Sequence, residues 1–296
     1  MQELLEKCPV CQHTQTQKYI TCEDFTVSHE KFDIVSCQKC GFKFTNPRPT
    51  ANTIGKYYQS ENYISHSNTS KGIISKIYHQ VRKITLQQKV DLINNLNGGK
   101  QGSLLDIGCG TGMFLNAAKS NGWKVAGVEP SDGARKMAEE INQISIPSEI
   151  VGSYKNQQFD IITMWHVLEH VHLLNETIEF LKEKSTQKGK VIIAVPNHES
   201  KDAQIYQEHW AAYDVPRHLY HFSRNSIQQL FENHGFKLKE HLPMKFDSFY
   251  VSMLSTKYQQ GNTNYVESFL SGLKSNRVGA KQNNNYSSII YIFEKK

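Results

Sequence analysis

A glycine-rich segment preceded by an acid is the part of this sequence that is most informative about chemistry. Asp106 stands two residues before the first glycine of Gly108-Cys109-Gly110-Thr111-Gly112, and the segment follows a short apolar run. Glycines in such a turn let a ligand approach the backbone closely. The spacing G-x-G-x-G differs from the G-x-G-x-x-G of dinucleotide-binding enzymes, and the carboxylate of Asp106 would repel a pyrophosphate. The segment therefore predicts a site for a positively charged ligand without phosphates.

A second acid, Glu129, ends the next predicted strand, in Gly127-Val128-Glu129-Pro130-Ser131. Its distance along the chain from the glycine turn is close to the ~20 residues at which an acid meets a ribose diol in such folds. One carboxylate can accept hydrogen bonds from both hydroxyls. S-adenosylmethionine combines a ribose with a sulfonium and an ammonium and has no phosphate, so it suits both acids. The residues predicted to contact this cofactor at the turn and the second strand are Asp106, Gly108, Cys109, Gly110, Gly112 and Glu129.

Four of the six cysteines form two C-x-x-C pairs, Cys8 with Cys11 and Cys37 with Cys40. Each pair places two thiolates on one side of a tight turn, so the two turns together supply a tetrahedral zinc site with four sulfur ligands. An iron–sulfur cluster uses the same ligands and is the better alternative, whereas a redox C-x-x-C motif normally opens a helix after a strand. Because four protein ligands leave no open position, we expect a structural metal. Metal-bound thiolates also indicate a reducing compartment, and we expect a cytoplasmic protein.

Histidines that follow two of the predicted strands are candidates for proton transfer. His166 comes directly after the fourth predicted strand, and residues 210–222, after the fifth, combine aromatic, acidic and basic side chains. The pKa of histidine lies near working pH, so His166 or His218 is the natural general base. Arg217 is suited to hold a carboxylate or phosphate of an acceptor. The structural alternative is that the histidines bond loop backbone and that Asp214 pairs with Arg217. The candidate catalytic residues are His166, His218, Asp214 and Arg217.

The elements that must position these residues alternate between strand and helix. Apolar runs predict strands at 103–107, 124–129, 143–146, 159–164, 190–195, 236–241 and 287–293. Helical patterns lie between them, at 112–121, 132–142, 173–185, 225–234 and 247–257. This alternation predicts an α/β fold with a doubly wound, mainly parallel sheet, in which ligands bind at the carboxyl ends of the strands. The glycine turn and His166 both stand at such ends.

Three regions are expected along the 296 residues. Residues 1–48 hold both cysteine pairs and predict a small zinc-ribbon-like module. Residues 49–98 resemble a helical linker or lid, in which Tyr57, Tyr58 and Tyr63 are candidates to fold over the cofactor; Tyr58 is the predicted cofactor contact. Residues 99–296 form the α/β domain. No apolar run approaches the ~20 residues needed to span a bilayer, so no membrane span is expected.

The α/β region, from about residue 99 to 296, resembles the class I S-adenosylmethionine-dependent methyltransferases, whose fold is Rossmann-like. Leu-Asp-Ile-Gly-Cys-Gly-Thr-Gly at 105–112 matches the first motif of that family, and Gly-Val-Glu-Pro-Ser at 127–131 matches its second-strand acid. Residues 159–171 resemble the fourth-strand segment of ubiquinone-biosynthesis-like, small-molecule members. The resemblance implies a seven-stranded sheet whose last strand, 287–293, runs antiparallel. It also implies cofactor contacts at Pro130, Ser131, Trp165 and His166, whereas residues 146–149 depart from the family's usual pattern for adenine contacts.

Three functions follow from these features. The leading interpretation is methyl transfer from S-adenosylmethionine to an oxygen or carbon of a small-molecule acceptor that is quinone-, sugar- or secondary-metabolite-like. The string at 214–222 also resembles one in bacterial methyltransferases with an N-terminal zinc module, some of them in sugar or secondary-metabolite pathways. An RNA methyltransferase is the main alternative, but the net charge of +6 is scattered and no Asn-Pro-Pro-Tyr-type motif follows the fourth strand. A non-catalytic cofactor-binding scaffold is the third interpretation.

Overall fold

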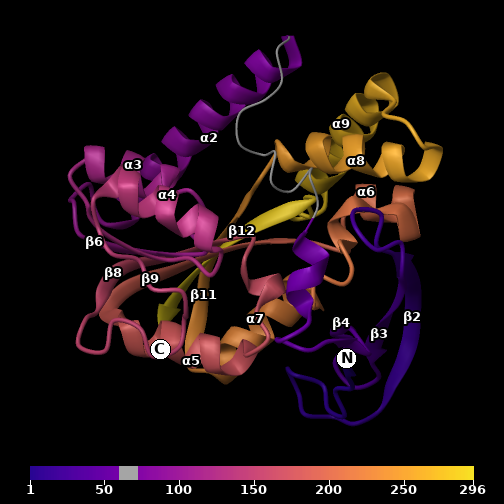
Figure 1. Ribbon diagram of the computed structural model, residues 1–296, viewed down its shortest axis with the longest axis horizontal. Coiled ribbons are helices and arrows are strands. Elements are labelled where there is room, and N and C mark those ends of the chain that lie inside the picture. The colour runs from indigo at the N-terminus through magenta and orange to yellow at the C-terminus, as the bar shows by residue number, and fades with distance from the viewer. Residues whose placement is uncertain (60–72) are drawn as a thin grey trace.

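The computed structural model describes residues 1–59 and 73–296, with side chains described from residue 80 onward in the second range. Two layers of helices enclose a central sheet, and the N-terminal segment packs beside it (Figure 1). No described helix combines the length and the apolar character that crossing a membrane requires. Tyr63, one of the three predicted lid residues, lies outside the described residues.

Among the described residues, the central sheet has six strands in the order β11-β12-β9-β8-β6-β7. Pairing is parallel between β6 and β7, β6 and β8, and β8 and β9, whereas β12 runs antiparallel to both of its neighbours, β9 and β11. The predicted doubly wound, Rossmann-like α/β fold is confirmed, including its antiparallel last strand. The strands are β6 Ser103–Ile107, β7 Lys124–Val128, β8 Phe159–Trp165, β9 Ser185–Pro196, β11 Phe236–Pro243 and β12 Ser288–Lys295.

The strand expected at 143–146 is not part of the sheet, so the described residues form six of the seven predicted strands. Gln143 has a φ of +53° and ends the preceding helix, which turns the chain out of an extended conformation. The amide of Ile146 donates to the Glu139 side chain at 2.9 Å. A single backbone bond, from Glu129 N to Pro147 O at 3.0 Å, joins this segment to the end of β7. Because Pro147 has no N–H, it cannot donate the next bond of a ladder.

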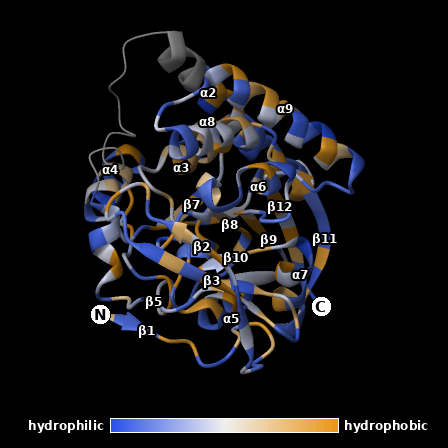
Figure 2. Ribbon diagram, turned by 90° about the vertical axis from the view of Figure 1, so that its right-hand side faces the viewer, coloured by the Kyte–Doolittle hydropathy of each residue, from blue (hydrophilic) through white to orange (hydrophobic). Residues whose placement is uncertain are grey.

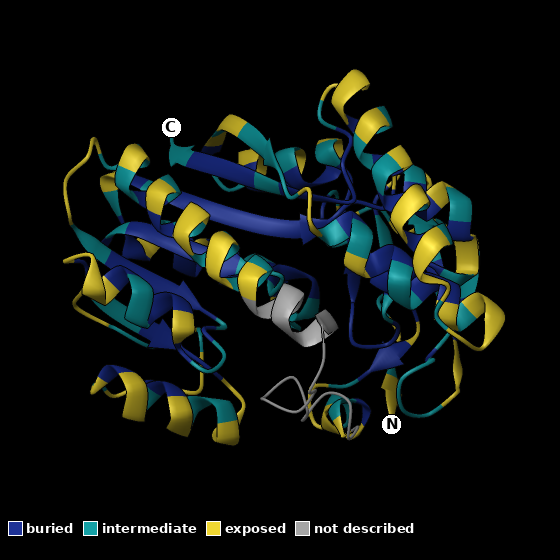
Figure 3. Cartoon of the chain, turned by 90° about the horizontal axis from the view of Figure 1, so that it is seen from above, coloured by how far each residue is buried: buried dark blue, intermediate teal, exposed yellow. Residues whose placement is uncertain are grey.

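Both faces of the central sheet are buried, because successive residues of a strand point to opposite sides. Leu104 and Ile161 pack with helices α2, α3 and α4, whereas the next residues, Leu105 and Ile162, pack with α5 and α7. Figure 3 shows the central strands buried between helices whose outer faces are exposed. The edge strand β11 is largely hydrophilic (Figure 2). The helices are α2 Ile73–Leu96, α3 Met113–Ser120, α4 Asp132–Asn142, α5 Leu174–Lys184 and α7 Arg224–Asn233.

The N-terminal segment forms an antiparallel sheet in the order β10-β4-β3-β2, in which β10 comes from a distant part of the chain. Tyr220 and His221 of β10 pair with Phe44 and Lys43. Two further short strands, β1 and β5, pair with each other. Cys8 and Phe44 belong to the same hydrophobic core as Leu105 of the central sheet. The strands are β1 Gln2–Glu3, β2 Thr16–Glu23, β3 Lys31–Cys37, β4 Lys43–Thr45, β5 Arg48–Pro49 and β10 Tyr220–His221.

A long connection between β9 and α7 contains β10. The same connection also packs against the N-terminal segment through a second group of hydrophobic side chains. Trp210 and Tyr213 of this connection pack with Phe32 and Ile34 of β3. A helical hairpin, α8 with α9, lies against the same region and joins β11 to β12. The remaining helical elements are η1 Ile54–Tyr58, η2 Leu168–His170, α6 Lys201–Tyr206, η3 Gln207–His209, η4 Ala211–Tyr213, α8 Asp247–Gln260 and α9 Tyr265–Lys281.

Candidate functional site

The four paired cysteines converge from two turns at the base of the N-terminal sheet. The Sγ atoms of Cys8 and Cys40 lie 3.6 Å apart, those of Cys11 and Cys37 lie 3.5 Å apart, and all four lie within 4.8 Å of one another. The amide of Gly41 donates to Cys37 O at 2.9 Å, which closes the second turn. Zn–S bonds of about 2.3 Å in a tetrahedron require sulfur separations just under about 4 Å. The arrangement therefore fits a four-thiolate metal site.

The glycine bend follows β6 and is held against the end of β7. The amides of Gly108 and Cys109 both donate to Val128 O, at 2.7 and 3.1 Å. Gly108 has a φ of +69°, and a Cβ at this position would lie 2.4 Å from Val167 Cγ2. The bend therefore requires glycine there, both for its left-handed conformation and for its close approach to the loop after β8.

Asp106, at the carboxyl end of β6, is buried beside the bend. Its Oδ1 accepts a hydrogen bond from Thr163 Oγ1 at 2.6 Å. Burial raises the pKa of Asp106 to about 7, although the Thr163 bond and the nearby charge of Lys89 oppose the rise. Burial therefore destabilises the ionised form of Asp106, and a cation bound near the carboxylate would stabilise that form.

Glu129 closes the bend from the end of β7. Its Oε2 accepts from Gly110 N at 2.8 Å and its Oε1 accepts from Ser131 N at 2.9 Å. Each carboxylate oxygen keeps a second lone pair, so the side chain can accept two further bonds from a diol. Pro130 and Ser131 follow at the start of α4, where Ser131 is the residue before the first helical turn.

Cys109 and Gly112 take part in the bend in ways the sequence could not distinguish. The Cys109 Sγ is buried beside Gly127, where an added Cβ would lie 2.9 Å from it. The thiol therefore fills the core between β7 and the bend, and only the Cys109 backbone lies along the bend. Gly112 has a φ of +77° and begins α3 against Ala138 of α4.

Trp165 ends β8, and a lysine that the sequence analysis missed lies over its ring. Lys89 Nζ of α2 is 4.2 Å from the centroid of the Trp165 ring, and Phe114 packs edge-on against the same ring at 5.8 Å. The Trp165 Nε1 is buried and has no hydrogen-bond partner. Burial lowers the pKa of Lys89, opposed by the charges of Asp106 and Asp247, so this lysine belongs to the same electrostatic group as the bend. A single lysine in a long helix carries no signal in the sequence that marks it as part of a site.

His166 lies between two carboxylates. Its Nε2 is 2.9 Å from Asp247 Oδ2 of α8, and its Nδ1 is 3.4 Å from Glu169 Oε1. Burial disfavours the charged ring, but the hydrogen bond to Asp247 and the charges of Asp247 and Glu169 outweigh it and raise the pKa of His166 to about 10. A ring that is protonated at neutral pH cannot accept a proton. The geometry therefore favours a positioning role for His166 over the predicted role of general base.

Glu169, His170 and His218 form a compact cluster next to His166. One ligand atom from each lies within 4.8 Å of the others, and the rings of His170 and His218 meet edge-to-face at 4.6 Å. The Nδ1 of His218 is 2.9 Å from Ala212 O, and the Nε2 is 3.9 Å from Asp214 Oδ2. Burial and the neighbouring His218 lower the pKa of His170 to about 4, so its ring is neutral at pH 7. The structure thus brings two of the predicted catalytic residues, His218 and Asp214, next to Glu169 and His170. The sequence did not predict that these four residues lie together.

Arg217 lies next to the cluster in sequence, but its side chain points away from it. The guanidinium is buried and donates to Asp214 at 2.7 and 3.0 Å, to Tyr57 O at 2.7 Å, to Thr26 at 2.9 Å and to Asp24 at 3.1 Å. These contacts occupy its donors. They fit the structural alternative, an Asp214–Arg217 pair that ties the connection to the N-terminal segment, better than the predicted anchor for an acceptor carboxylate.

The tyrosines predicted as lid residues are separated by the structure. Tyr58 Oη lies 3.0 Å from His170 Nδ1, which places Tyr58 at the histidine cluster. Tyr57 is buried, and its hydroxyl donates to Glu30 at 2.8 Å, so this ring belongs to the contact between η1 and the N-terminal sheet.

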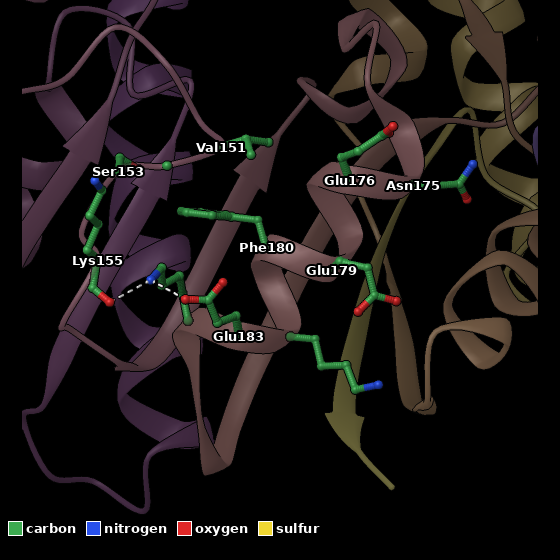
Figure 4. A pocket seen from close by; sticks show the side chains of 11 residues that line it. Val151, Ser153, Lys155, Asn175, Glu176, Glu179, Phe180 and Glu183 are labelled. Atoms are coloured by element: carbon green, nitrogen blue, oxygen red, sulfur yellow. Dashed lines mark hydrogen bonds and ion pairs between the residues drawn. The ribbon is translucent and has the colours of Figure 1, made fainter.

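A separate hollow lies between α5 and residues 151–155, and Figure 4 shows its lining side chains. It holds Lys155, Glu179 and Glu183 but none of the predicted site residues. Lys184 also lines it and donates to Lys155 O at 3.1 Å and to Glu183 at 2.6 Å. Because the hollow contains none of the residues at the glycine bend or the histidine cluster, we assign it no part in the chemistry described here.

Comparisons with known proteins place the chain in a family. A family model described as "Methyltransferase domain" matches residues 78–241. The ubiquinone biosynthesis O-methyltransferase of Rickettsia bellii is 25% identical over 194 residues, which cover 60% of this chain and 79% of the relative. An uncharacterised methyltransferase of Alkaliphilus oremlandii is 31% identical over 126 residues, covering 40% of this chain and 55% of the relative.

The fold is also similar to that of solved structures. Magnesium protoporphyrin IX methyltransferase from Synechocystis PCC 6803, solved with bound SAH, superposes with a TM-score of 0.53 at 12% identity, covering 81% of this chain and 97% of that structure. At this identity, the similarity shows a shared fold and nothing finer.

Proposed function

This chain belongs to the class I methyltransferases and is an S-adenosylmethionine-dependent enzyme, and we propose that it methylates an oxygen or carbon of a small-molecule acceptor. The observation that carries the proposal is the pair of buried carboxylates, Asp106 and Glu129, that flank the glycine bend. Two acids at one backbone turn suit a cationic nucleoside and disfavour a polyphosphate. When bound, S-adenosylmethionine supplies an electrophilic methyl group on a sulfonium.

The cofactor contacts that we propose follow from what each residue can still accept or pack against. Glu129 keeps two free lone pairs for ribose hydroxyls, and Asp106 offers a carboxylate to an ammonium. Gly110, where an added Cβ would meet nothing within 4 Å, leaves the backbone of the bend open to a ligand, whereas Gly108 and Gly112 let the bend pack against Val167 and α4. Trp165, with Pro130 and Ser131, borders the same end of the sheet.

We propose that the acceptor binds beside Glu169, His170 and His218. The Nδ1 of His218 forms its hydrogen bond with the carbonyl oxygen of Ala212, which can only accept. Nδ1 therefore carries the proton, and Nε2 keeps its lone pair. Nε2 can therefore take the proton of an acceptor hydroxyl or acidic carbon, and Asp214 at 3.9 Å stabilises the imidazolium that forms. Held between Asp247 and Glu169, His166 fixes the loop that carries this cluster.

The acceptor class rests on likeness rather than on a contact. The relative in Rickettsia bellii is by its name an O-methyltransferase of ubiquinone biosynthesis. The string at 214–222 resembles one in bacterial methyltransferases with an N-terminal zinc module, some of them in sugar or secondary-metabolite pathways. A phenol, an enol, or a hydroxyl or carbon of a sugar could give up its proton to the proposed acceptor, His218 Nε2. We therefore propose a quinone-, sugar- or secondary-metabolite-like acceptor.

We further propose that Cys8, Cys11, Cys37 and Cys40 hold a structural zinc ion, since four converging thiolates match its preferred ligand set. Residues 1–48 would then be the zinc-binding part, residues 49–98 the helical linker and residues 99–296 the methyltransferase domain. Thiolates that bind zinc require a reducing environment, which supports a cytoplasmic location.

The test of the proposed function separates cofactor binding from turnover. We expect calorimetry to show binding of S-adenosylmethionine, and we expect His218→Ala to abolish formation of S-adenosylhomocysteine with a panel of phenol, quinol and sugar acceptors while that binding is retained. His209→Ala, outside the cluster, is the matched control. Unchanged turnover in His218→Ala would remove His218 from the mechanism. Absence of binding at millimolar cofactor would leave only a scaffold role.

A further inference from the structure

Glu169, His170 and His218 have the composition of a metal site as well as of a proton relay. Among the described residues, two groups of metal-binding side chains converge within 4.8 Å: the four cysteines, and this trio. The trio comes from two separate segments, η2 and the connection after β9. The backbone bond from Leu219 N to Glu169 O, at 2.7 Å, holds these segments together.

The hydrogen bonds of both rings leave the Nε2 nitrogen of each with its lone pair. His170 Nδ1 lies 3.0 Å from Arg217 O, and His218 Nδ1 lies 2.9 Å from Ala212 O. A carbonyl only accepts, so Nδ1 is the N–H in each neutral ring and Nε2 is the free ligand atom. Metal-binding histidines show this same arrangement, in which a backbone carbonyl or carboxylate fixes the other nitrogen as donor.

Glu169 supplies the observation that a proton relay does not explain. Its side chain is fully buried, and neither of its carboxylate oxygens has a hydrogen-bond partner. The nearest cation is His166, with Nδ1 at 3.4 Å from Oε1. A buried carboxylate without hydrogen bonds is costly, because it loses its water contacts and regains nothing of equal strength. A cation bound between Glu169 and the two imidazoles would stabilise the negative charge of this carboxylate.

We propose that Glu169, His170 and His218 bind a divalent transition-metal cation. Two imidazoles and one carboxylate suit manganese, iron, cobalt or zinc better than magnesium or calcium, which prefer oxygen ligands alone. Three protein ligands leave coordination positions open, and an acceptor oxygen can fill one of them. This last role rests on the proposed function; the binding of the cation does not. In the cation-bound form, the Nε2 lone pair of His218 belongs to the cation, so proton transfer to His218 belongs to the cation-free form.

Manganese is the probe that tests this site without disturbing the cysteines, because thiolates prefer softer metals. The full chain, as purified, is titrated with Mn²⁺ alone, and the electron paramagnetic resonance signal of free Mn²⁺ reports binding. We expect one saturable site per chain. Glu169→Gln, which keeps the size of the side chain but removes its charge, should weaken binding at least about tenfold. His218→Gln should do the same, whereas Glu208→Gln, an exposed acid outside the cluster, should bind as the unaltered chain does.

Each outcome decides the proposal. Loss of binding in Glu169→Gln and in His218→Gln, with Glu208→Gln unchanged, supports it. Absence of a saturable Mn²⁺ site in the unaltered chain, or equal binding by both cluster variants, overturns it. If Glu169→Gln does not fold, His218→Gln alone gives the answer. Because the titration contains neither cofactor nor acceptor, its failure leaves the proposed methyl transfer untouched, and a failure of methyl transfer leaves the titration untouched.

Discussion

The burial of Asp106, the acid at the end of β6, can make the site prefer a positively charged ligand. Asp106 is almost fully buried, with Thr163 as its hydrogen-bond donor, and its pKa is raised to about 7 by that burial. Near neutral pH it is therefore divided between a neutral and a charged form. A cationic ligand binds the charged form better, so binding and ionisation are linked.

This linkage predicts that cofactor affinity depends on pH. Below a pKa of about 7, only a falling fraction of Asp106 is ionised. We expect the affinity for S-adenosylmethionine to rise more than about tenfold from pH 5.5 to pH 7, a range in which the amine of the cofactor stays protonated. Calorimetry at several pH values measures it. The Asp106→Asn variant should bind S-adenosylmethionine more weakly, and its affinity should depend much less on pH. If the variant keeps the full pH dependence, the titrating group is not Asp106.

The sequence predicted which residues lie together at the bend better than which lie together in the connection, for a physical reason. At the bend, Asp106, the glycines and Glu129 are constrained by local geometry, so their spacing alone carries the signal. Arg217 and His218 are adjacent in sequence, yet one is saturated by Asp24 and Asp214 whereas the other keeps a free nitrogen. That difference depends on which distant segments meet there, and spacing along the chain does not contain it.

At the scale of elements, an ion pair ties the start of α8 to the end of β8. Asp247 Oδ2 lies 2.9 Å from His166 Nε2, and the pKa of His166 is raised to about 10 against the effect of burial. A histidine whose folded-state pKa is raised contributes stability that is fully present below about pH 6.5 and is lost as pH rises through about 10.

We therefore expect Asp247→Asn to lower the free energy of unfolding by about 1.5–3 kcal/mol at pH 7, since a charge-assisted hydrogen bond is lost. The difference from the unaltered chain should shrink above pH 10, where His166 is neutral in both. Urea denaturation at the two pH values measures it. Asp132→Asn, whose side chain is 82% exposed, is the control and should change stability by less than about 0.5 kcal/mol. An equal loss at both pH values would show that the ion pair is not the cause.

Elements with a buried, regular pattern were the predictable ones. Strand β6 was predicted at its observed bounds, and α4 likewise, because a short apolar run marks the strand and a helical pattern marks α4. Helix α9, Tyr265–Lys281, was not predicted, because its buried residues are serines and glycines while Phe269 and Leu270 are exposed. A helix whose buried face is small and polar gives no hydrophobic period to detect.

At the scale of the whole molecule, the N-terminal segment and the methyltransferase fold share one interior. Thr45 N of β4 donates to Leu219 O at 3.0 Å, and Leu219 N donates to Glu169 O at 2.7 Å, so backbone bonds run from the cysteine-bearing segment to the candidate acceptor site. Arg217 adds buried contacts to Asp24 and Thr26 of the same segment. The pairing of β4 with β10 was not foreseeable, because a two-residue strand has no pattern of its own.

This shared interior predicts how the chain responds to loss of the cysteine-bound metal. The cluster that contains Cys8, Cys37 and Phe44 also contains Leu105 and Leu219, so the N-terminal segment cannot unfold without exposing part of the central core. We expect Cys40→Ala to lose the proposed zinc and to lower the melting temperature of the whole chain by about 5 °C or more, in a single transition, with weaker binding of S-adenosylmethionine. Differential scanning calorimetry, metal analysis and cofactor titration measure the three effects.

Cys22→Ala is the matched control for that experiment, because Cys22 is buried in β2 but lies outside the four-cysteine group. It should keep its metal, and its smaller loss of stability should reflect only the truncated side chain. Two transitions in Cys40→Ala, the higher one at the melting temperature of the unaltered chain, would mean that the segment unfolds alone. The acceptor site would then have to be held by the methyltransferase fold itself, since the bond from Thr45 N to Leu219 O would already be broken, whereas the bond from Leu219 N to Glu169 O lies within the fold.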